Sequence, residues 1–169
     1  MKSSNRFALL ATVVVALSSL SSVAMAASAT GTANATVLAP IAITAVNSLE
    51  FGTFSANTAG TVVIPSGGTR SVTGGVVGAT GTSRPATFNV TGTGGATFGI
   101  TYPAAFNVVS GANTMSVSLT NPSAANAATG TLVGGAVTIS VGAVLTVAAA
   151  QPAGNYSNST NMIINVEYN

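Results

Sequence analysis

Short runs in which apolar and small polar residues alternate one by one constrain the fold of this chain more than any other feature. The clearest runs are Ala86–Thr91, 115–120 and 137–141. Successive side chains of a β-strand point to opposite faces of its sheet, so this period of two predicts strands with one face in a core and one in water. Half-buried strands of this kind are typical of antiparallel sheets.

The rest of the chain fits the same all-β pattern. No convincing helix follows residue 26, and clusters of Gly, Pro, Ser and Asn at 65–68, 92–95, 110–113 and 151–155 predict turns. Short strands with frequent turns favour a single antiparallel β-sandwich over a barrel or solenoid. Further strands are predicted at 37–46, 48–54, 61–64, 71–77, 97–102, 143–147 and 161–169.

The first 26 residues have the organisation of a secretory signal peptide. Lys2 and Arg6 precede an apolar stretch at 7–23, and Ala24-Met25-Ala26 is a small-x-small triplet of the kind that signal peptidase cleaves. Removing these 26 of the 169 residues leaves 143, enough for one domain with a core. We therefore expect export through the inner membrane, and a mature chain found first in the periplasm and then at the cell surface.

The composition of the mature chain excludes several classes of function. Its charged residues are Arg70, Arg84, Glu50 and Glu167, so its formal charge is zero and no basic patch predicts nucleic-acid binding. It contains no His, Cys, Asp or Lys, so the common general-base and covalent schemes, metal sites and disulfides lack their residues. No cofactor, metal or catalytic residue is predicted. Glu50 and Glu167 alternate with apolar neighbours on predicted strands, which predicts surface charges rather than a catalytic pair.

Both ends of the predicted domain carry stripes suited to strand addition. The last predicted strand alternates Met162, Ile164, Val166 and Tyr168 with Ile163, Asn165, Glu167 and Asn169, and we expect its edge to be uncovered by later residues. Such an edge exposes unpaired backbone groups, unless the strand lies in mid-sheet. Residues 27–36 form a polar N-terminal extension, whose small-to-apolar stripe suits a donated strand; the other interpretation is a disordered terminus. The stripe continues past residue 36 into the predicted domain and consists of Ala29, Ala33, Ala35, Val37 and Ile41.

Four short segments of the chain form a set that can be compared with known families: 37–40 (Val-Leu-Ala-Pro), 49–52 (Leu-Glu-Phe-Gly), 86–90 and 153–169. They resemble a bacterial secreted domain of unknown function, which is itself similar to the spore-coat-protein-U-like subunits of archaic chaperone–usher pili. The resemblance implies an immunoglobulin-like sandwich that lacks its last strand, with a periplasmic chaperone and an outer-membrane usher as partners. By position, Gly154, Tyr156, Val166 and Tyr168 match the pattern that pilins present to the chaperone. The cysteine pair common in pilins is missing, and Gly154 lies two residues further from the C-terminus than usual.

These observations predict a structural fimbrial subunit, with the signal peptide at 1–26, the extension at 27–36 and the sandwich domain at 37–169. Neighbouring copies would be joined by strand addition, with Met162, Ile164, Val166 and Tyr168 lining the accepting groove. The alternative is a monomeric secreted binding module, a complete sandwich whose loops at 92–95 or 111–113 contact a glycan or surface polymer. The two differ in whether the sandwich is closed without its N-terminal extension.

Overall fold

The computed structural model describes residues 25–120 and 129–169. By its internal contacts the chain forms two units, and the boundary between them lies between Ala35 and Thr36. Residues 25–35 are exposed and belong to no strand. The predicted signal peptide lies outside the described residues, apart from Met25 and Ala26. No helix long and apolar enough to cross a membrane occurs within 25–120 or 129–169.

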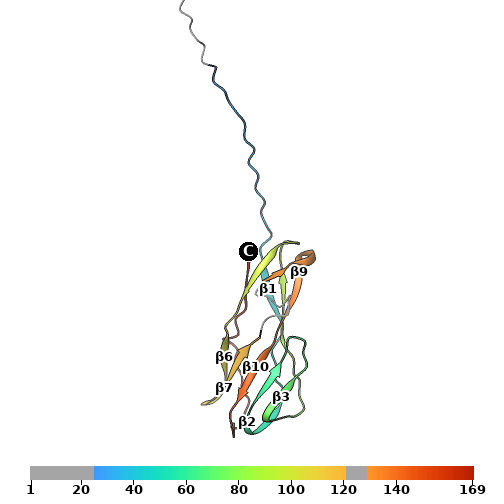
Figure 1. Cartoon of the computed structure of the whole chain (residues 1–169), viewed down its shortest axis with the longest axis vertical. Helices are drawn as coiled ribbons and strands as arrows, with labels where there is room; N and C mark the ends of the chain where they lie inside the picture. The colour runs from blue at the N-terminus through green and yellow to red at the C-terminus, as the bar shows by residue number, and fades with distance from the viewer. Residues whose placement is uncertain (1–24, 121–128) are drawn as a thin grey trace, which may run out of the picture. The chain divides into compact units, whose positions relative to one another are not determined.

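Residues 36–169 form an all-β unit, as the alternating pattern predicts (Figure 1). In its described part, the one helical element is a 3-10 turn, η1, at Val133–Gly135. The strands are β1 (Ala42–Asn47), β2 (Phe54–Ile64), β3 (Ser71–Gly78), β4 (Ala86–Thr91), β5 (Thr97–Thr101), β6 (Ala105–Ser110), β7 (Asn113–Leu119), β8 (Thr129–Thr131), β9 (Ala136–Val141), β10 (Ala143–Val147) and β11 (Asn165–Tyr168).

Hydrogen bonds join these strands into three antiparallel sheets. Two of them have three strands each, in the orders β1-β4-β9 and β11-β5-β8, and the third has five, in the order β3-β2-β10-β7-β6. Val90 of β4, Ile139 of β9 and Phe98 of β5 have no exposed surface and belong to one apolar cluster. The two small sheets therefore share a core, which gives this part of the unit its sandwich character.

The five-stranded sheet buries a second apolar cluster on its inner face. Val62, Val117 and Leu145 are fully or almost fully buried there, and they come from β2, β7 and β10. Leu49 and Leu119 pack against both clusters, so the two cores are continuous.

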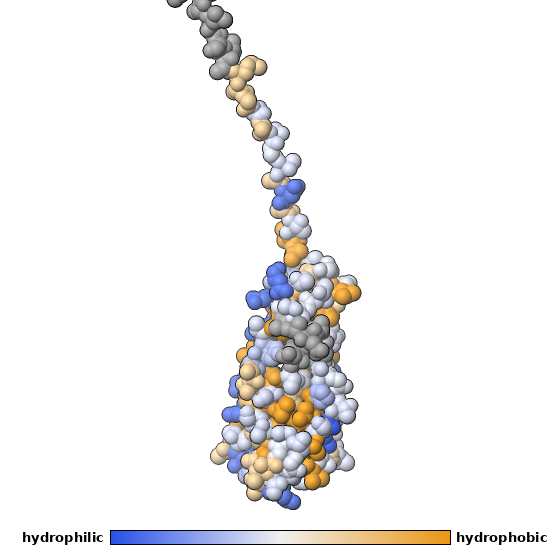
Figure 2. All heavy atoms as spheres, in the orientation of Figure 1, coloured by the Kyte–Doolittle hydropathy of each residue, from blue (hydrophilic) through white to orange (hydrophobic). Residues whose placement is uncertain are grey.

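On the face seen in Figure 2 most of the surface is pale, because it is built from small side chains of intermediate hydropathy.

The run of chain formed by β9 and β10 passes from the sandwich to the five-stranded sheet. β9 pairs with β4, whereas β10, which follows after one residue, pairs with β2 and β7. The residue between them is the buried Gly142. A Cβ atom at Gly142 would overlap the carbonyl oxygen of Ile64 and lie 2.8 Å from the backbone nitrogen of Ser66. The chain therefore changes sheets where a side chain has no room.

The prediction of a strand at 48–54 is wrong. Within it, before β2 begins at Phe54, only Glu50 forms a β-bridge, with Arg84. Apolar and polar residues alternate in 48–54 because Leu49 and Phe51 reach the core from a loop. The Arg70 guanidinium holds this loop by donating hydrogen bonds to three carbonyl oxygens, those of Phe51 (3.0 Å), Thr53 (3.2 Å) and Ala79 (2.6 Å).

Most other predicted strands are present, with shifts at their ends. β4 and β10 have the predicted bounds, but β1 begins at Ala42 rather than residue 37, and β2 begins earlier than predicted. The prediction missed β6 and β8. β8 is Thr-Gly-Thr, which has no apolar side chain, and its Gly130 lies against the Phe98 ring, where a Cβ atom would come 2.5 Å from Cζ.

The crossing at Gly142 generates a stability prediction. Gly142→Ala should lower the free energy of unfolding by about 1–3 kcal/mol, because the added methyl group meets backbone atoms that cannot move independently. Urea denaturation followed by circular dichroism measures the change. Gly67→Ala is the matched control, since a Cβ atom there meets nothing within 4 Å. Equal stability of the two variants would contradict this account of the crossing.

Candidate interaction site at an open sandwich edge

β11 is an edge strand with an apolar inner face. In the described part of the chain it pairs with β5 alone. Ile164 is 8% exposed, and Met162, Val166 and Tyr168 are half-buried against the sandwich core, whereas the residues between them are exposed. The four residues predicted to line an accepting groove therefore point inward, Val166 and Tyr168 from β11 and Met162 and Ile164 from the segment just before it.

β1 forms a second edge over the same core. It pairs with β4 alone among the described strands, and Ile41 and Ile43 pack half-buried against the sandwich cluster. β1 and β11 come into contact, but no backbone hydrogen bond between them occurs in residues 36–120 and 129–169. Two edges, one from each small sheet, thus flank half-buried apolar side chains that no further described strand covers.

The Tyr168 hydroxyl ties these edges together at one end. It donates a hydrogen bond to the carbonyl oxygen of Ala39 (2.8 Å) and accepts one from the backbone N–H of Thr93 (2.7 Å). The Thr93 hydroxyl accepts in turn from the backbone N–H of Ala39 (2.7 Å). We call this three-residue arrangement the Tyr168 clasp. It fixes β11, the turn between β4 and β5, and the chain just before β1.

The residues predicted to be donated fall into two groups. Ala29, Ala33 and Ala35 are exposed and belong to no strand, and Val37, in the unit that begins at Thr36, is 93% exposed. Ile41 instead packs against its own core. The described structure does not bring Ala29, Ala33, Ala35 or Val37 into a ladder, and it places Ile41 beside the open edge.

A family model described as a domain of unknown function, DUF4402, matches residues 41–168. The chain belongs to this family. No curated protein and no solved structure was found to match it. The DUF4402 region includes β1 and β11, so both open edges lie inside the family's domain, whereas Ala29, Ala33, Ala35 and Val37 lie before it.

The loops of the DUF4402 domain that were predicted as alternative binding sites differ in their surroundings. The turn at 92–95 is tied down, because Gly92 N–H donates to the Gly135 carbonyl oxygen (2.9 Å), Gly95 N–H donates to that of Leu132 (2.7 Å), and Thr93 belongs to the clasp. The loop at 111–113 is the exposed tip of the β6–β7 hairpin.

The two carboxylates have different environments. Glu50 was predicted on a strand as a surface charge; it lies in a loop, and its Oε1 is 2.7 Å from Nη2 of Arg84, with 37% of the Glu50 and 43% of the Arg84 side chain exposed. An ion pair this exposed contributes about 0–1 kcal/mol. Glu167 is exposed on β11, as predicted. Residues 25–120 and 129–169 contain no cluster of three or more His, Cys, Asp or Glu that could hold a metal.

The Tyr168 clasp leads to a prediction for a single-atom change. Tyr168→Phe removes both hydrogen bonds of the hydroxyl and should lower the free energy of unfolding by about 1–2 kcal/mol. The backbone amide of Thr93 should exchange with solvent faster, because its acceptor is gone. Hydrogen exchange followed by NMR measures this effect. Glu167→Gln, on the outer face of β11, is the control and should leave the exchange of Thr93 unchanged.

Proposed function

We propose that this protein is a non-enzymatic structural subunit that joins to neighbouring copies by strand addition and so builds a surface fibre of the fimbrial type. The observation that carries the proposal is the open edge between β1 and β11. Its half-buried apolar side chains lie beside two strands that each pair on one side only within the described residues.

An added strand would satisfy this edge in two ways. Its backbone would pair with the free N–H and C=O groups of β11 or β1, and its inward side chains would cover Val166 and Ile43. Backbone pairing is independent of sequence, so recognition would depend on which side chains fit over the half-buried residues. This edge supports a role as an acceptor.

The N-terminal extension is the donor in this proposal. Residues 27–36 are exposed and unpaired, which leaves their backbone groups available. Ala29, Ala33 and Ala35 bury little area, so Val37 would supply the largest apolar contact of the donated stretch. Ile41 is held in its own core and Ala39 in the Tyr168 clasp, so the donated strand would depart just before Ala39.

The remaining parts of the proposal depend on the predicted signal peptide and on the resemblance to archaic chaperone–usher pilins. After export, the open edge would be exposed to water in the periplasm. A periplasmic chaperone would protect the edge there until an outer-membrane usher passes the subunit to the surface. Unpaired edges with apolar inner faces aggregate readily, which is the physical reason for such protection.

A monomeric secreted binding module remains the alternative. The exposed tip at 111–113 favours it, because a loop held by a hairpin is a usual place for ligand contacts. The open edge favours the fibre, because in a monomer no strand among residues 25–120 and 129–169 would cover β1 and β11.

The fibre proposal predicts a heat-sensitive polymer. Surface material sheared from the native cells should give a ladder on SDS gels when unheated and a monomer when boiled. Deleting residues 27–36 should abolish the ladder, and Val37→Asp should reduce it by at least tenfold, because a carboxylate would be buried without a partner.

Val77→Asp is the matched control for Val37→Asp. Val77 is also an exposed valine, 64% exposed on β3, and it belongs to neither edge. This variant should give the wild-type ladder. A monomer band in every lane, heated or not, would reject the fibre and favour the binding module.

A further inference from the structure

The outer face of the five-stranded sheet carries a row of polar side chains that crosses all its strands. Strand register places Thr73 opposite Thr61, Thr61 opposite Thr146, Thr146 opposite Ser116, and Ser116 opposite Asn107. Neighbouring strands lie roughly 4.8 Å apart, so the row presents a hydroxyl or amide at about that spacing. None of the five residues carries a charge.

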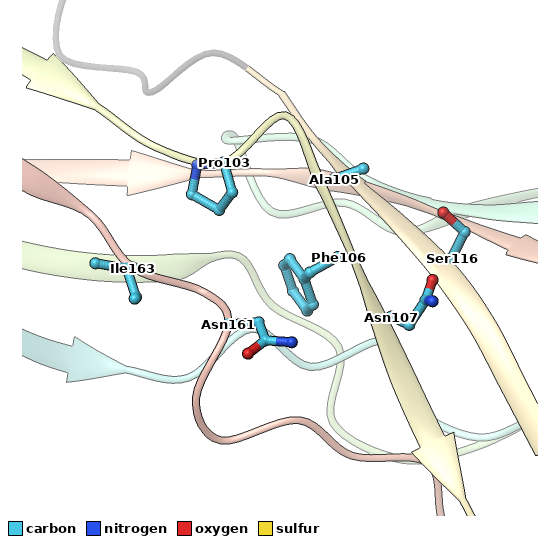
Figure 3. Close-up of a pocket in the computed structure, with 7 residues that line it drawn as sticks. All are labelled: Pro103, Ala105, Phe106, Asn107, Ser116, Asn161 and Ile163. Atoms are coloured by element: carbon cyan, nitrogen blue, oxygen red, sulfur yellow. The ribbon is translucent and has the colours of Figure 1, made fainter. Parts of the chain in front are cut away.

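This row ends in a hollow at the edge of the sheet. In Figure 3 the Phe106 ring lies between Pro103 and Ile163 on one side and Asn107 and Ser116 on the other; Phe106 also packs half-buried against the second core cluster, so its ring borders the hollow from the inner face of β6. It is a shallow hollow open to solvent, with a volume of about 550 Å³. It is lined by Pro103, Ala105, Phe106, Asn107, Ser116, Asn161 and Ile163.

The hollow exists because a β-ladder is interrupted there. On one side of the gap Asn165 pairs with Thr101 of β5. On the other side Ser157, eight residues before Asn165, pairs with Val109 of β6, eight residues after Thr101. The register is therefore the same on both sides of the gap. Between these points no backbone hydrogen bond joins the two described segments. Pro103 has no N–H to donate to the ladder.

Asn158 holds the gap open. Its side-chain nitrogen donates to the Asn107 carbonyl oxygen (2.6 Å), and its side-chain oxygen accepts from the backbone N–H groups of Thr160 (2.9 Å) and Asn161 (2.8 Å). These bonds turn the chain away from β6 at the place where the ladder would continue. The hollow is therefore a defined feature of the fold and not a loosely packed edge.

The hollow combines one aromatic ring with polar groups that have spare hydrogen-bonding capacity. Among the described residues, the Asn107 amide, the Ser116 hydroxyl and the amide nitrogen of Asn161 have no hydrogen-bond partner, while Oδ1 of Asn161 accepts from the Thr160 hydroxyl (2.9 Å). A side-chain amide offers donors and an acceptor on one plane. No charged side chain lines the hollow.

We propose that this hollow and the adjoining row bind a neutral saccharide. One face of a pyranose ring carries C–H groups that would pack on the Phe106 ring, and its hydroxyls would bond to the amides of Asn107 and Asn161 and to Ser116. Further sugar units would lie along the row over Thr146 and Thr61. Acidic saccharides and nucleic acids are disfavoured, since no cation is present to pair with their charge.

This site is separate from the open edge and does not rest on strand addition. It lies on β6, β7 and the segment before β11, whereas the donated strand would cover β1 and β11. It also differs from the loop at 111–113, because its residues belong to strand edges and not to a hairpin tip.

The test uses the full mature chain and a panel of short neutral oligosaccharides of glucose, galactose, mannose and N-acetylglucosamine, with oligogalacturonate as the acidic comparison. Titration followed by NMR should shift the Phe106 ring and the side-chain amides of Asn107 and Asn161 with at least one neutral member. Asn161→Ala and Asn107→Ala should each raise Kd by roughly three- to tenfold, the effect of one lost hydrogen bond.

Thr138→Ala is the matched control, because Thr138 is an exposed polar residue on β9, in the β1-β4-β9 sheet, and this variant should bind as the wild type does. Phe106→Leu keeps an apolar side chain and removes the ring, so it should weaken binding while circular dichroism shows a folded chain. The proposal is overturned if no neutral oligosaccharide shifts these signals, if oligogalacturonate binds best, or if both Asn variants bind unchanged.

Discussion

The continuous strand formed by β9 and β10 is the element on which the rest of the structure depends. Its first half belongs to the sandwich and its second half lies in the middle of the five-stranded sheet. With no disulfide in the described chain, the two cores are connected through this strand and through Leu49 and Leu119, which touch both. Buried Val, Ile and Leu side chains supply the stability, and Gly142 allows the backbones to approach at the crossing.

Polar side chains support the fold where ladders end. Arg70 satisfies three carbonyl oxygens of loops, Asn158 satisfies groups at the interrupted ladder, and Tyr168 connects three separate segments. Arg70 and Tyr168, two of the few charged and aromatic residues of the chain, thus bond to backbone groups outside the ladders. The two features proposed to act in binding, the open edge and the hollow beside β6, lie next to such supporting residues.

The sequence predicted the parts of the fold that local alternation determines. β4 was predicted with its observed bounds because its apolar and polar residues alternate, and the inward stripe from Met162 to Tyr168 follows from the same period. Leu49 and Phe51 alternate equally well but lie in a loop, since burial of two side chains does not require a ladder. β8 was missed because its pairing depends on Phe98, distant in sequence. The hollow was not predicted, because it requires the register between β6 and the segment before β11.

The clasp between Tyr168, Thr93 and Ala39 also bears on how the domain would respond to force. Tension applied to the chain ahead of Ala39 would reach these hydrogen bonds before it reached the ladder between β1 and β4. Part of the load would pass through the tyrosine side chain into β11, on the opposite sheet, so both sheets would resist extension together. The clasp would thus delay the peeling of β1, which is otherwise held by one neighbouring strand.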